Sequence, residues 1–167
     1  MKCKNCKESF ERIRQNQIVC SIECAYQLQS KAKAKKDKAE TKAKKIKLKT
    51  YTQKVNDAKK VFQKWIRNRD AGKPCISCGC SLNGGIYHAG HYKKSEIYRG
   101  VVFNEFNVNG QCIKCNLYLD GNESNYRSGL VKKIGEKRVV ELEELAEQTR
   151  KYKYSDAELD EIKKKYK

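Results

Sequence analysis

The residues best suited to chemistry lie between two pairs of cysteines in the middle of the chain. Cys75-x-x-Cys78 and Cys112-x-x-Cys115 enclose both histidines of the sequence. Two such pairs are typical of a zinc site, because each short turn presents two thiolates to one tetrahedral ion. Four thiolates leave no open position for a substrate, so we expect this zinc to be structural. Chemistry must then come from nearby polar side chains, and the candidates are His88, His91, Asn107 and Asn116.

A second set of four cysteines opens the chain, and it has a different spacing: Cys3, Cys6, Cys20 and Cys24. The last two fall at the start of a predicted helix, whose N-terminus helps to stabilise thiolate charge. We interpret residues 1–28 as a treble-clef-like zinc finger, because so short a segment could hardly fold without metal. The alternative is a set of free cysteines in an apolar patch. Cys80 is the odd ninth cysteine; it is either a free thiol or an exchange partner at the second zinc.

The composition favours a nucleic-acid partner. The formal net charge is +18, and a field of that size attracts polyanions. Residues 1–72 carry 21 Lys and Arg against 7 Asp and Glu, whereas residues 73–167 carry 17 against 13. No segment resembles a signal peptide or an apolar membrane span, so we expect a soluble protein of the cytoplasm, with no membrane partner and with cysteines in the reduced state.

The elements that must position these residues are mostly helical. Residues 25–70 contain neither proline nor glycine and are rich in Ala, Lys, Gln and Glu, so we predict one long Lys-rich helix over residues 29–72. Its first half has lysines on every side and should be solvated or laid against phosphate, although a flexible basic linker is an alternative. From Tyr51 an apolar stripe appears and should pack on the next domain. The lysines predicted to contact DNA are Lys33, Lys35, Lys36, Lys42, Lys44 and Lys45.

The pattern of residues 73–121 predicts a small domain built around the second zinc site. We expect a strand over 86–92, a weaker strand or extended loop over 103–111, and a short helix over 113–120 that Gly121 ends. On that helix Asn116 and Asp120 would project from one face and could share a cation. Three helices should follow in residues 122–167, divided near Gly135 and Ser155. The predicted fold class is therefore α+β and mostly helical.

Residues 75–121 resemble the HNH, or ββα-metal, endonuclease motif in its zinc-knuckle form. The resemblance implies that His91 is the general base, that Asn107 orients the attacking water, and that Asn116 holds one divalent cation, Mg²⁺ or Mn²⁺. The whole chain, with its cysteine finger, basic helix and HAGHY…NVNGQCIKCN core, resembles the NinG or Rap family of lambdoid phages. That family implies cleavage of branched DNA in recombination, with recombination proteins or a second copy of the chain as further partners, in a bacterial host cell.

The sequence departs from the HNH pattern at the residue before the base, which is commonly a metal ligand and here is Gly90. Side chains alternate along a strand, so His88 shares the face of position 90 and is a plausible substitute ligand, while His91 points the other way. The opposite assignment of the two histidines fits the alternation equally well. A third interpretation has both histidines merely packing near the zinc or replacing a cysteine ligand.

Basic residues around this core could contact phosphates beside the cut, or could form an ordinary solvated face: Lys93, Lys94, Arg99 and Arg127. The pattern as a whole predicts a metal-dependent, structure-selective DNA endonuclease acting on Holliday, Y or D-loop-like junctions, with two structural zinc ions. One rival is a non-catalytic zinc module that binds nucleic acid. The other is a recombination adaptor whose C-terminal helices bind another protein.

Overall fold

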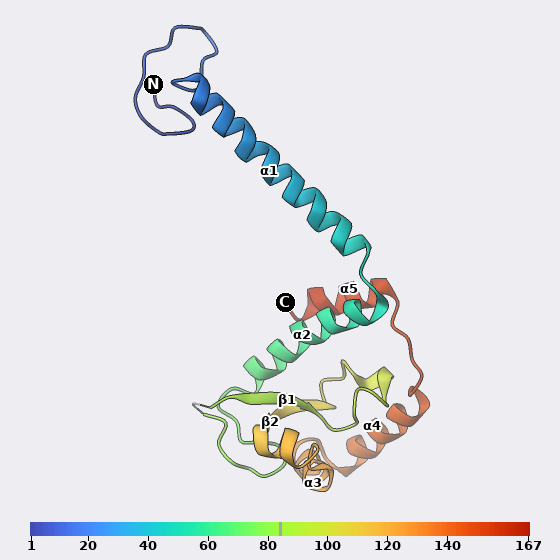
Figure 1. The fold of residues 1–167 in the computed structure, drawn as a ribbon. Coiled ribbons are helices and arrows are strands. Elements are labelled where there is room, and N and C mark those ends of the chain that lie inside the picture. The colour runs from blue at the N-terminus through green and yellow to red at the C-terminus, as the bar shows by residue number, and fades with distance from the viewer. Residues whose placement is uncertain (84) are drawn as a thin grey trace. The chain divides into compact units, whose positions relative to one another are not determined.

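The chain forms two separate compact units, Met1–Lys49 and Thr50–Lys167, in a computed structural model (Figure 1). The structure describes residues 1–83 and 85–167, so Gly84 of the predicted Asn83–Gly85 turn lies outside the described residues. The first unit is a short cysteine-bearing loop region, in which Lys2 pairs with Ser9, followed by helix α1, Ile22–Lys47. Every side chain from Lys31 to Lys44 is exposed, as expected for a helix with lysines on all sides.

The long helix predicted over residues 29–72 is two helices. Helix α1 ends at Lys47, and α2 spans Tyr51–Arg69. The break has a local cause that the propensity argument overlooked. Thr50 caps α2 by accepting a hydrogen bond from the Gln53 N–H, and the Gln53 side chain accepts one from the Thr50 N–H. A Thr-x-x-Gln capping box satisfies the backbone donors of a new helix, so it can start one without any glycine or proline.

Helix α2 supplies one hydrophobic core of the second unit. Its buried residues Ala58, Phe62 and Ile66 pack against the sheet and against α5, Asp156–Lys165. The apolar stripe predicted from Tyr51 onward therefore packs on the domain that follows it. The helix ends at Arg69 with Asp70 as its C-cap residue, and Gly72 then adopts a positive φ of 78°, a conformation that favours glycine.

The sheet is one antiparallel pair, β1 (Tyr87–His91) and β2 (Val108–Cys112). The predicted first strand is confirmed, and the weaker second one is shorter than its predicted range. In the observed register His88 lies opposite Gln111 and His91 lies opposite Val108. The connection between the strands contains a short 3-10 helix, η1, at Arg99–Val101.

The helix after β2 is shorter than predicted. It is a single turn of π-helix, η2, Lys114–Tyr118, instead of a helix over 113–120. Asp120 lies beyond it with a positive φ of 46°. The expectation that Asn116 and Asp120 share a helix face is therefore wrong, because the helix has ended before Asp120.

The C-terminal region confirms three helices: α3 (Glu123–Ile134), α4 (Glu136–Gln148) and α5. Helix α4 ends at Gln148, several residues before the division predicted near Ser155. Helices α3 and α4 pack together around a second core that includes Tyr126, Leu130 and Leu142. The fold is thus α+β and mostly helical. Within the described part of the chain, no helix has both the length and the apolar character needed to span a bilayer.

Candidate metal centres and polar pocket

The four N-terminal cysteines converge on one point. The sulfur atoms of Cys3, Cys6, Cys20 and Cys24 all lie within 4.8 Å of one another. The Cys6–Cys20 and Cys20–Cys24 sulfur separations are 3.6 and 3.5 Å. Four sulfurs placed tetrahedrally about 2.3 Å from a zinc ion lie about 3.8 Å apart, so the cluster fits zinc. Two backbone N–H groups, from Asn5 and Cys20, point at the Cys3 sulfur from 3.4 Å and favour its thiolate form.

The second set, Cys75, Cys78, Cys112 and Cys115, converges in the same way. The sulfurs of Cys78 and Cys112 are 3.8 Å apart, the tetrahedral spacing. Backbone N–H groups and the Asn122 side chain donate to three of the sulfurs. Because Cys112 ends β2 and Cys115 lies in η2, a bound ion would tie the knuckle before β1 to the end of the hairpin. Cys80 is exposed and is not one of the four converging cysteines.

A cluster of polar side chains lies where η2 meets the hairpin. Asn116 of η2 contacts His88 of β1, with its side-chain nitrogen 2.8 Å from the ring Nδ1. Gln111, opposite His88 on β2, is fully buried, and its side-chain oxygen has no hydrogen-bond partner among the described residues. A Cβ atom at Gly90 would lie 2.1 Å from this oxygen and 2.9 Å from the Asn116 oxygen. The space that a side chain at position 90 would fill is therefore taken by two carboxamide oxygens.

His91 lies on the opposite face of β1 from His88. Its Nε2 is 3.2 Å from the carbonyl oxygen of Val102. A carbonyl can only accept, so this contact places the ring proton on Nε2 and leaves a lone pair on Nδ1. Burial lowers the pKa of His91 to about 4, and the charge of Lys59 acts in the same direction. The ring is therefore neutral at pH 7.

Asn107 is completely buried, and its side chain is bonded to backbone groups. Its oxygen accepts from the Lys93 N–H, and its nitrogen donates to the carbonyls of Lys93 and Val101. These bonds fix the two ends of the segment between Lys93 and Val101, next to the Val102 carbonyl that contacts His91. The Asn107 carboxamide thus already uses its hydrogen-bonding groups on the backbone. Its position suits holding the Val102 carbonyl, the hydrogen-bond partner of His91, in place. Orientation of a water by Asn107 stays a prediction from the sequence.

A pocket of about 400 Å³ opens beside His91. His91 and Asn116 both line it, so Asn116 touches the pocket and the His88 cluster at once. Asp120 is also on its wall, mostly exposed and paired with Lys94 at 2.6 Å. Lys59 of α2 lines it too, and it was missed in the sequence. Lys59 lies at helical spacing from Val55 and Phe62, so it borders the apolar stripe of α2. A lysine in such a position is easily taken for a solvated residue.

Comparison with known proteins identifies the family. The family model described as "Bacteriophage Lambda NinG protein" matches residues 1–167. The chain belongs to the NinG family. It is 38% identical to the ninG protein of Escherichia phage lambda over 162 residues, covering 85% of this chain and 79% of the relative. It is also 36% identical to that of Escherichia phage 933W and 34% identical to that of Salmonella phage P22, each over 99% of this chain and 89% of the relative. No solved structure matches.

The basic residues predicted to bind DNA in this NinG chain differ in their surroundings. The described side chains among the named α1 lysines are exposed, and the side chain of Lys45 lies outside the described part. One of these lysines, Lys36, lies 4.0 Å from Glu40. In the second unit three of the four named residues are held by carboxylates, since Lys93 pairs with Glu123, Lys94 with Asp120, and Arg127 with Glu136 and Glu143. Arg99 is exposed.

Proposed function

We propose that this chain is a divalent-cation-dependent DNA endonuclease of the HNH, or ββα-metal, type. The observation that carries the proposal is the state of His91. It is a neutral imidazole whose Nε2 is fixed by the Val102 carbonyl, and it lines a pocket that also contains Asn116. The order of elements, an antiparallel hairpin followed by a short helix and closed by a cluster of four cysteines, supports the same assignment.

His91 takes the role of general base. A neutral imidazole with a free Nδ1 lone pair can accept a proton from water at pH 7, and the water then attacks the phosphorus of the scissile phosphodiester. The Val102 carbonyl stabilises the imidazolium that forms, because the Nε2–H already points at it. Asn107 is a positioning residue in this scheme, since it fixes the segment that leads to Val102.

The residues around Gly90 fit a hard divalent cation. The unpartnered Gln111 oxygen, the Asn116 oxygen and the ring of His88 provide two oxygen donors and one nitrogen donor, which suit Mg²⁺ or Mn²⁺. Such a cation would stabilise charge on the phosphate and on the leaving oxygen. Gln111 takes the place of the ligand that Gly90 cannot supply. Asp120 lines the same pocket as Asn116 and is a further oxygen donor.

Branched DNA is the substrate that best suits the distribution of charge. Residues 1–49 carry 15 Lys and Arg against 5 Asp and Glu, and they form a unit separate from the one that bears His91. A junction offers separate duplex arms to a basic helix and to a cleavage pocket. Phosphate contacts supply affinity without reading sequence, so recognition would rest on DNA shape. Action on recombination intermediates follows from the resemblance to the NinG or Rap family.

The test is an assay of synthetic four-way, Y-shaped and linear duplex DNA with zinc-loaded protein, in the presence and absence of Mg²⁺. We expect nicks near the branch point, which require Mg²⁺ and are much weaker in the linear duplex. Binding of all three substrates with no cleavage in Mg²⁺ or Mn²⁺ would refute the nuclease assignment and favour the non-catalytic DNA-binding module.

A further inference from the structure

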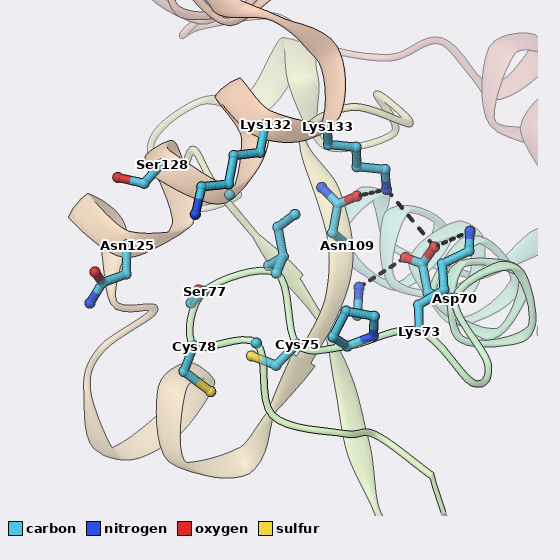
Figure 2. A pocket seen from close by; sticks show the side chains of 15 residues that line it. Asp70, Lys73, Cys75, Ser77, Cys78, Asn109, Asn125, Ser128, Lys132 and Lys133 are labelled. Carbon is cyan, nitrogen blue, oxygen red and sulfur yellow. Dashed lines mark hydrogen bonds and ion pairs between the residues drawn. The ribbon is translucent and has the colours of Figure 1, made fainter.

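A second pocket, of about 610 Å³, lies between the Cys75–Cys78 knuckle and helix α3 (Figure 2). It shares no lining residue with the pocket of His91. Its wall is closely packed, because α3 touches the knuckle at Gly129, where a Cβ atom would lie 1.9 Å from the Ile76 carbonyl oxygen. The knuckle cysteines belong to the second metal cluster, so a bound zinc ion would hold the pocket in shape.

The electrostatic character of this pocket is positive. Asp70 is a buried residue of the lining and binds Arg69, with Lys73 at 3.2 Å and Lys133 at 3.9 Å. Burial alone would raise the pKa of Asp70, but hydrogen bonds from Arg69 and Gly110 and the Lys133 charge lower it to about 2. Asp70 is the only acid among the described lining residues, and it faces three cations. The net charge of this group is therefore positive.

Lys132 gives the pocket a cation that no carboxylate of the described residues holds. It extends from α3 on the pocket wall, and the described part of the chain provides no partner for its ammonium group (Figure 2). Ser77 and Asn125 add neutral donors. The Ser77 hydroxyl accepts a bond from Gln111, which leaves its own proton free to donate, and the Asn125 amide uses one of its two N–H groups on Asn122.

We propose that this pocket binds a backbone phosphate of DNA, held by the Lys132 ammonium with Ser77 and Asn125 as neutral donors. The proposal rests on the proposed DNA substrate and extends it to a second point of contact, away from the pocket of His91. It differs from the expectation drawn from the sequence, in which the contacts in this unit came from Lys93, Lys94, Arg99 and Arg127. Three of these four already have carboxylate partners, and the fourth, Arg99, does not line this pocket, whereas Lys132 lines it and has no such partner among the described residues.

The experiment measures the affinity of zinc-loaded protein for a fluorescent four-way junction across a series of salt concentrations, without added divalent cation. One phosphate contact contributes about 0.9 to the slope of log affinity against log salt. Lys132→Ala should therefore reduce the slope by about 0.9 and weaken binding about 8-fold at 0.1 M salt. Asn125→Ala should weaken binding while leaving the slope unchanged, because it removes a donor but no charge.

The matched control is Lys164→Ala, which removes an exposed lysine of α5 that lines none of the described pockets. It should leave the slope nearly unchanged. An unaltered slope in Lys132→Ala, or an equal loss in Lys164→Ala, would overturn the phosphate site while wild-type binding still supported a DNA substrate. A wild-type protein that binds no DNA would instead refute the proposed function itself.

Discussion

Replacing Asp70 with asparagine removes a buried charge while keeping the shape of the side chain. Only 4% of the Asp70 side chain is exposed, and its carboxylate accepts hydrogen bonds from Arg69, Lys73 and the Gly110 N–H. Its pKa is about 2, against an ordinary value of 3.8. At about 1.4 kcal/mol for each pKa unit, the charge stabilises the folded state by about 2 to 3 kcal/mol.

This stabilisation is present in full above the unfolded pKa and is lost as the pH falls from about 4 towards 2, so a measurement at pH 7 captures all of it. The unit Thr50–Lys167 has an unfolding entropy of about 0.25 kcal/mol per degree, from about 2.1 cal/mol/K for each residue. Asp70→Asn should therefore lower the Tm of this unit by about 10 °C. Differential scanning calorimetry at pH 7 with excess zinc measures the shift.

The control is Asp160→Asn, which neutralises an exposed carboxylate paired with Lys163 at 2.6 Å. An exposed ion pair contributes little, so its Tm should stay close to that of the wild type. A shift in Asp70→Asn no larger than that of the control would refute the reasoning, since it would mean that the buried charge adds nothing to stability.

Three further predictions concern the metal sites, the histidine and the basic helix. Native mass spectrometry should find two zinc ions for each chain, and one or none would mean that one or both cysteine clusters hold no zinc. Below pH 6.5 His91 becomes protonated in the unfolded state, whereas in the folded state its ring stays neutral down to about pH 4. Zinc-saturated protein should therefore lose about 1 kcal/mol of unfolding free energy between pH 7 and 5.5. An identical loss in His91→Gln would contradict this. The last prediction concerns five lysines of α1: Lys33, Lys35, Lys36, Lys42 and Lys44. Neutralising them should reduce the slope of log affinity for DNA against log salt by about 0.9 for each phosphate that they neutralise in the complex. An unchanged slope would show that they bind no phosphate.

Much of the fold could be predicted from the sequence, because metal knuckles, helix faces and helix caps are determined by residues close together in the chain. Short cysteine spacings place two sulfurs on one turn, and both clusters converge as expected. Apolar periodicity identified the packed face of α2, and the division predicted near Ser155 matches the start of α5, where Ser155 and Glu158 form a capping box. The break before α2 was missed because helix propensity outweighed a polar cap at Thr50.

The candidate site depended on information that sequence spacing does not contain. The role proposed for Gln111 rests on its register opposite His88, and the long connection between the strands hides that register in the sequence. Asp120 was misplaced because η2 ends after one turn. The ion pairs of Lys93, Lys94 and Arg127 join segments far apart in the chain, so their charges could not be recognised as already partnered.

The measurement that tests the catalytic assignment most directly is a Mg²⁺ and Mn²⁺ titration of single-turnover junction cleavage by His91→Ala and His88→Ala. His91→Ala should lose about 100-fold to 10,000-fold in rate at every metal concentration while still binding the junction, because the base is gone and no charge has changed. His88→Ala should need more metal and recover partly when it is supplied, because one ligand is removed and the base remains. Recovery of His91→Ala but not of His88→Ala at high metal would reverse the two roles, and full activity in both variants would contradict the assignment.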